Sequence, residues 1–110
     1  MRHETTRIYQ RALELVSLSK QVIDDLPTGC GFLADQLRRA SSSVALNFAE
    51  GCGKSSLADQ RRFFRIARGS ATEISAIFDV AIRLDAVSDE RHALGKDLCD
   101  HLARMLILFR

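Results

Sequence analysis

The side chains with the clearest potential for chemistry are basic and lie close together in the chain. Arg61, Arg65 and Arg68 are spaced i, i+4 and i+7, so in a helix they occupy about 60° of arc and form one stripe. Arg62 flanks them, and Lys54 lies just upstream. Because guanidinium groups bind phosphate through paired hydrogen bonds, the pattern indicates a nucleic-acid-binding face. The alternative is an ordinary solvated helix surface.

No pattern in the sequence predicts a catalytic or metal site. Gly-rich phosphate loops, paired-histidine zinc motifs and supported serine–histidine arrangements are absent from the sequence. The three cysteines are odd in number and lack close pairing: Cys30, Cys52 and Cys99. We expect them to be reduced thiols. The histidines are too scattered for a metal: His3, His92 and His101. The chain is therefore expected to be non-enzymatic and without a cofactor.

Length and composition predict one globular domain over residues 1–110. Hydrophobic residues make up 46% of the chain, which is ordinary for a folded domain. The net charge is +2, from 16 basic and 14 acidic residues, and does not by itself require a nucleic-acid partner. No apolar run approaches the ~18 residues of a membrane span, and the polar start lacks the apolar centre of a signal peptide. We expect a cytoplasmic protein.

Apolar residues recur at spacings of three and four throughout the chain, which is typical of amphipathic helices. The pattern predicts helices over residues 6–26, 31–50, 57–87 and 88 to the end. Ser56 and Ser88 are expected to cap the third and fourth, Pro27 to end the first, and Gly51 to stop the second in the left-handed conformation. Four helices joined by short links predict an all-α, antiparallel up-down-up-down four-helix bundle.

The third helix carries two apolar stripes. The first is a seam spaced by fours and threes: Phe63, Ala67, Ser70, Ile74, Ile77, Ala81 and Leu84. The second is spaced by sevens: Phe64, Ala71 and Phe78. A helix that is apolar over so much of its circumference is expected to contact two neighbouring helices. The arginine stripe is expected to lie roughly opposite the first seam. Gly69 is tolerated most easily where a neighbour packs on its bare backbone.

Polar residues on the second helix suggest how it aligns with the third. Asn47 falls on the apolar seam of the second helix, where a buried amide is expected to bond to another helix and fix the register. A ligand-binding amide is the alternative. Arg39 is expected to pair with Glu73, and Glu50 with an arginine of the third helix.

Two segments together resemble a known family. LRRASSSVALNFAEG, residues 37–51, resembles the signature of the 23S rRNA intervening-sequence proteins, with Phe48 replacing the usual isoleucine. RRFFRIARGSATEI, residues 61–74, resembles the second half of that signature, with Phe64 replacing leucine. The resemblance covers nearly the whole chain. It implies an antiparallel four-helix bundle that forms a ring-like homopentamer, with these structural signature positions: Arg39, Asn47, Glu50, Gly51, Gly69, Ser70 and Glu73.

The resemblance leaves the biochemical role open. Some members of the family are encoded within intervening sequences of bacterial 23S rRNA genes. The related accessory variability determinant proteins of diversity-generating retroelements form basic pentamers that bind nucleic acid and a reverse transcriptase. Our leading hypothesis is a non-enzymatic oligomer that binds RNA or DNA through Arg61, Arg65 and Arg68. The alternative is a scaffold or adaptor for a protein such as a reverse transcriptase, which the apolar C-terminal residues 106–109 would suit.

Overall fold

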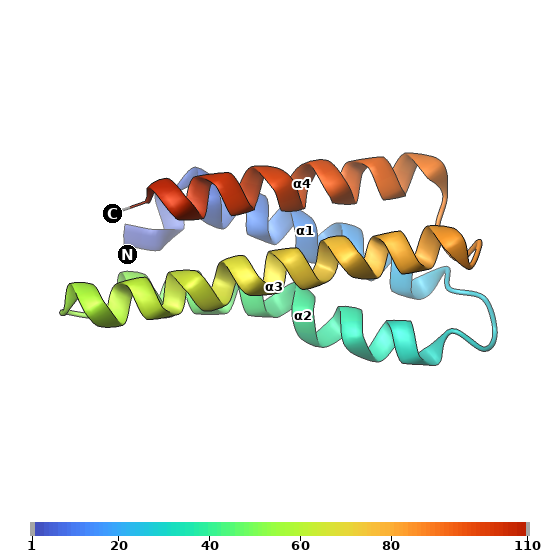
Figure 1. Ribbon diagram of the computed structural model, residues 1–110, viewed down its shortest axis with the longest axis horizontal. Helices are drawn as coiled ribbons and strands as arrows, with labels where there is room; N and C mark the ends of the chain where they lie inside the picture. Colours follow the sequence, from blue (N-terminus) through green and yellow to red (C-terminus); the bar gives the residue numbers. More distant parts are fainter. Residues whose placement is uncertain (1, 110) are drawn as a thin grey trace.

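The computed structural model describes residues 2–109, and four α-helices account for most of them (Figure 1). They are α1 (Arg7–Asp24), α2 (Gly31–Cys52), α3 (Leu57–Arg83) and α4 (Asp89–Leu108), preceded by a 3-10 turn, η1 (Arg2–Thr5). Within this described range there is no β-strand, so the all-α prediction is confirmed. None of the described helices combines the length and the apolar character that crossing a bilayer requires.

The helices lie side by side along a molecule of 45 × 21 × 20 Å. Each helix contacts two others, since α1 packs on α2, α2 on α3, α3 on α4, and α4 again on α1. Figure 1 shows that consecutive helices run in opposite directions along the long axis, which brings both termini to the end where α2 connects to α3. This closed cycle of neighbours is a four-helix bundle.

The core face of α3 combines the two predicted apolar stripes. Its buried residues are Phe64, Ala67, Ser70, Ala71, Ile74, Ile77, Phe78 and Ala81. Phe63 is only half-buried and Leu84 is 49% exposed, although both belong to the predicted seam. The reason is that α3 packs against both α2 and α4, as its two apolar stripes predicted. The face between these neighbours becomes the core, and it is rotated toward Phe64 and Phe78.

Local signals explain most helix ends. The hydroxyl groups of Ser56 and Ser88 accept from the backbone N–H three residues later, at 3.2 Å in each case, so both predicted caps are confirmed. α1 ends at Asp24 rather than at residue 26, because a residue before proline disfavours helical geometry.

The end of α3 was predicted four residues too late. Asp85 adopts a φ of +55°, and two backbone hydrogen bonds close the turn, from Asp85 N to Ile82 O and from Ala86 N to Ala81 O. These bonds define a Schellman motif in which Ala86 packs back on the core. The sequence did not reveal it, because glycine usually takes the left-handed position.

Gly51 does not stop α2, so that prediction is wrong. The helix continues through Gly51 to Cys52, and Gly53 is the C-cap with an ordinary φ of −87°. Gly51 is buried, and a Cβ there would lie 2.6 Å from Cε1 of Phe64. The missing side chain therefore lets α3 approach α2. Gly95 of α4 has the same role, since its Cβ would lie 2.6 Å from Cε1 of Phe78.

We predict opposite effects for alanine at two helical glycines. Gly51→Ala should lower the free energy of unfolding by about 1–3 kcal/mol, because the new methyl group overpacks the Phe64 ring. Gly69→Ala should raise it by roughly 0.5–1 kcal/mol through reduced backbone entropy, since no atom lies within 4 Å of a Cβ there. Urea denaturation at one protein concentration measures both. A neutral Gly51→Ala would contradict the packing role.

Candidate nucleic-acid interface

The three stripe arginines lie in the first half of α3, at the edge that faces α4. Arg61 and Arg65 are exposed and Arg68 is half-buried. The stripe was predicted to lie roughly opposite the first apolar seam of α3, but the second apolar stripe is also buried and lies next to it. Phe64, which is buried in the core, is only about 60° around the helix from Arg61. The stripe therefore borders the core instead of opposing it, and this places the arginines beside the end of α4.

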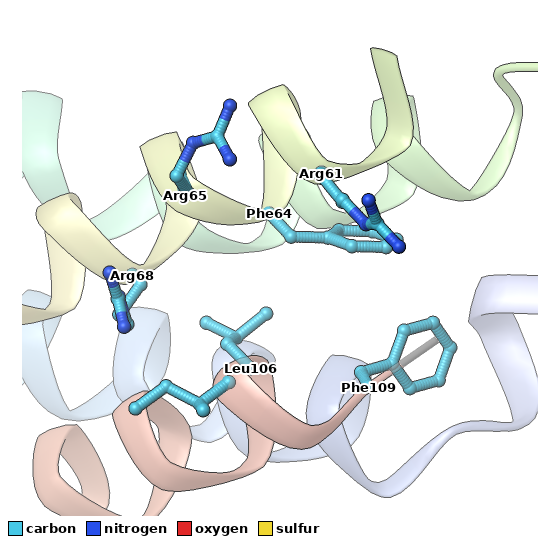
Figure 2. Close-up of a pocket in the computed structure, with 7 residues that line it drawn as sticks. Arg61, Phe64, Arg65, Arg68, Leu106 and Phe109 are labelled. Carbon is cyan, nitrogen blue, oxygen red and sulfur yellow. The ribbon is translucent and has the colours of Figure 1, made fainter. Parts of the chain in front are cut away.

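A hollow of about 180 Å³ separates the arginine stripe from the last turn of α4. It is lined by Arg61, Phe64, Arg65, Arg68, Leu106, Ile107 and Phe109. Figure 2 shows Arg61 alongside the Phe64 ring, Arg68 turned toward Leu106, and Arg65 pointing away from Leu106. The site thus combines a basic rim from α3 with an apolar floor.

Two phenylalanine rings, Phe64 and Phe109, line the apolar side of the hollow, and Phe48 packs behind them. The ring of Phe109 lies edge-on to that of Phe64, with 5.3 Å between their centroids, and to that of Phe48 at 5.1 Å. Phe64 and Leu106 are almost fully buried, whereas Ile107 is 54% exposed. This cluster could not be predicted from the sequence, because no spacing links Phe48, Phe64 and Phe109. The only signal was that an apolar C-terminal segment needs burial.

The stripe arginines lack the carboxylate partners that most basic side chains of this protein have. Within the described residues, these are the basic side chains with no carboxylate within 4.0 Å: Arg7, Arg61, Arg65, Arg68 and Arg83. Three of these five form the stripe. Their guanidinium groups are therefore available to an anion from outside the chain.

Arg62 and Lys54 belong to a different surface from the stripe. Both approach the ring of Phe63, with the Arg62 guanidinium carbon 4.4 Å and the Lys54 ammonium 5.1 Å from its centroid. Arg62 also lies 4.0 Å from Asp59, and Lys54 lies 3.1 Å from Glu50. The five basic residues predicted to act together therefore form two groups. Three belong to the stripe, and the other two, Arg62 and Lys54, are paired with carboxylates of this chain.

The signature residues align α2 with α3. Arg39 and Glu73 pair at 3.3 Å across the two helices, as predicted. The Ser43 and Ser70 hydroxyl groups share a hydrogen bond of 2.7 Å between the same helices.

Two predictions for the signature residues of α2 are wrong. Asn47 does not bond to another helix: its amide donates to the carbonyl and the hydroxyl oxygen of Ser43, one turn back, at 2.9 Å each. Asn47 therefore holds Ser43 in place, and the hydroxyl group of Ser43 forms the hydrogen bond to α3. Glu50 pairs with Lys54 at the end of its own helix, not with an arginine of α3, because that cation lies one turn further along the same face.

Two titratable groups outside the stripe have shifted pKa values, Asp79 and Cys99. Asp79 of α3 binds Lys96 at 2.7 Å and His92 at 2.9 Å on α4, and these hydrogen bonds lower the pKa of its carboxyl group. Burial raises the pKa of the Cys99 thiol to about 12. None of the three cysteines forms a disulfide. No group of three or more metal-ligating side chains occurs in the part of the chain that the structure describes.

This geometry defines an all-α four-helix bundle, and comparison with known proteins identifies its family. Residues 4–108 match the 23S rRNA-intervening sequence proteins, and the chain belongs to that family. A crystal structure of a protein of unknown function from the S23 ribosomal protein family of Bacteroides thetaiotaomicron VPI-5482 has a similar fold, with a TM-score of 0.83. The two chains are 20% identical over 91% of this chain and 94% of the other. No curated protein gives a significant match.

The serine bridge predicts a measurable coupling between α2 and α3. Ser43→Ala and Ser70→Ala should each destabilise the fold, and a double-mutant cycle should give a coupling free energy of about 1 kcal/mol, as expected for one partly buried hydrogen bond. Chemical denaturation of the four proteins measures it. Ser42→Ala is the matched control, since the Ser42 hydroxyl group donates to Arg39 O of its own helix, and it should show no coupling with Ser70→Ala. Additive effects of Ser43→Ala and Ser70→Ala would disprove the bridge.

Proposed function

We propose that this protein is a non-enzymatic, cytoplasmic oligomer that binds RNA or DNA through Arg61, Arg65 and Arg68. The observation that carries the proposal is that these three side chains have no carboxylate partner among the residues that the structure describes, whereas most other cations there are paired. An arginine without an internal partner keeps its full potential to bind phosphate. The stripe covers about 10 Å along the helix axis, which suits several consecutive phosphates.

The mechanism we propose is phosphate neutralisation with little reading of base edges. Each arginine that engages a phosphate releases condensed counterions, so affinity falls steeply as salt concentration rises. Phosphate contacts fix the position of the nucleic acid without reading sequence. The low net charge of the single chain makes oligomerisation important, because an assembly would present several stripes to one strand.

Support for an oligomer comes from exposed apolar residues on the outer face of α2 and α3. Leu46 and Ile66 are 66% and 41% exposed, and Phe32 and Val80 are 53% and 46% exposed. Each lies seven residues from a member of the Arg39–Glu73 ion pair, so the residues form two apolar pairs that flank it, two helical turns away on either side. Repeats of seven are the pattern that packs against another helix.

We therefore propose a second copy of the chain as the partner of this outer face. The apolar pairs lie on the α2-facing edge of α3, whereas the arginines lie on its α4-facing edge. A neighbouring subunit can dock on the first edge and leave the second open to nucleic acid. The ring of five subunits is a part of the proposal that rests on the family resemblance.

A second candidate function is an adaptor for a protein partner, for example a reverse transcriptase. The observation that favours it is the exposure of Ile107 and Leu108, at 54% and 77%, next to the hollow. Leu106 and Phe109 of the same segment are engaged in the core. A protein partner would cover the two exposed side chains.

We predict that charge reversal of the stripe abolishes nucleic-acid binding. The triple variant Arg61→Glu, Arg65→Glu and Arg68→Glu should not bind at 50 mM salt. For the unmodified protein, the logarithm of the binding constant should fall against the logarithm of salt with a slope of about −2 to −3 per engaged subunit. Fluorescence anisotropy measures both.

The matched control reverses the same amount of charge elsewhere, with Lys20→Glu, Arg38→Glu and Arg83→Glu. It should keep most of the affinity, because these side chains lie outside the stripe. Equal losses in both triple variants would reduce the effect to net charge and contradict the assigned site. An unmodified protein that binds no nucleic acid at low salt would overturn the proposed function.

We also predict that the outer face holds the oligomer together. Light scattering at micromolar concentration should give a multiple of the subunit mass. The double variant Leu46→Lys, Ile66→Lys should have a lower measured mass, closer to that of the monomer, because assembly would bury two unpaired charges. Leu13→Lys with Leu94→Lys is the control, since these leucines are also exposed but lie on α1 and α4. A monomeric unmodified protein would disprove the assembly.

A further inference from the structure

We infer that the hollow between α3 and α4 receives an unpaired base, so that this protein prefers single-stranded to double-stranded nucleic acid. The inference rests on the proposed function and names the class of nucleic acid that the same site would take. It starts from the composition of the lining, which places Arg61 and Arg68 on the rim and Phe64, Leu106 and Phe109 on the floor (Figure 2).

The apolar floor has no use in a site that binds phosphate alone. A phosphate group needs donors, and Arg65, whose side chain points away from Leu106 in Figure 2, can supply them without any contact with the apolar floor. Aromatic and aliphatic surface instead suits the faces of a nucleobase, which stack on aromatic rings whatever the base. The half-buried Phe109 ring, with Ile107 beside it, provides that surface at the edge of the hollow.

The rim of the hollow suits the sugar-phosphate chain on either side of such a base. Arg61 and Arg68 are seven residues apart, about 10 Å along α3, and both have no carboxylate partner among the described residues. An arginine can stack its planar group on a base and also donate to phosphate. One nucleotide in the hollow would therefore leave its neighbouring phosphates within reach of the stripe.

A duplex cannot use the hollow in this way. Its bases are paired and stacked inside the helix, so only its phosphates can reach Arg61, Arg65 and Arg68. Double-stranded nucleic acid should therefore bind only through the contacts between its phosphates and the arginines. Single strands should gain the additional contact with the floor.

The test compares probes of nearly equal charge that differ in their bases. Oligo-dT of twenty-four nucleotides, an abasic oligonucleotide of the same length and a duplex of twelve base pairs carry nearly the same number of phosphates, and they are titrated by fluorescence anisotropy at one salt concentration. We expect oligo-dT to bind about tenfold more tightly than the other two, which corresponds to one stacked base.

Substitutions of the apolar lining residues test whether the base contacts the floor of the hollow. Phe109→Ala should weaken oligo-dT about tenfold and leave the abasic probe unchanged. Because Phe109 also packs on Phe48 and Phe64, Ile107→Ser provides a second variant at an exposed lining position, and it should weaken oligo-dT by a smaller factor. Leu94→Ser, at an exposed position of α4 that is not part of the lining, is the matched control and should have no effect. Circular dichroism confirms that each variant is folded.

Each other outcome overturns the inference, and the outcomes separate it from the proposed function. Equal affinities for all three probes, with steep salt dependence, would disprove the base site and keep the phosphate stripe. Failure of every probe to bind at low salt would overturn both. Tighter binding of an acidic twelve-residue peptide than of oligo-dT, lost in Ile107→Ser, would assign the hollow to a protein partner.

Discussion

The close approach of α2 and α3 is the constraint on which the rest of this structure depends. Gly51 has no side chain, so the Phe64 ring occupies the space where a Cβ would lie. Once Phe64 is buried there, the rotation of α3 about its own axis is determined. Arg61 and Arg65 are one turn or less from Phe64, so the same packing contact turns the arginine stripe toward α4. The candidate interface is in this sense a consequence of a core contact.

The polar contacts between α2 and α3 reinforce this arrangement without supplying most of its stability. The Arg39–Glu73 pair is largely exposed, and exposed ion pairs contribute only about 0–1 kcal/mol. The bond between Ser43 and Ser70 is shielded and makes one specific alignment of the two helices favourable. Apolar burial drives the association of the helices, and these contacts select one register among those that burial alone would allow.

The sequence predicted several local features correctly and others incorrectly. The difference depends on whether the deciding contact lies within a few residues along the chain or comes from another helix. The caps at Ser56 and Ser88 were correct because a hydroxyl group acts on a backbone N–H three residues away. Gly51 was misread as a stop because glycine has two uses, a left-handed turn and a close contact, and only the position of Phe64 distinguishes them. Asn47 was expected to reach α3, but its own helix offers Ser43 at shorter range.

The sequence by itself determined the number of helices, their approximate limits and the grouping of Arg61, Arg65 and Arg68 on one face, because periodicity and capping act within a few residues. Only the tertiary structure decided which side of the bundle that face occupies. It also brought Phe109 and Leu106 from the end of the chain to the stripe. The physical reason is that the rotation of α3 depends on which stripe its two neighbours bury together, and residues distant in sequence decide that.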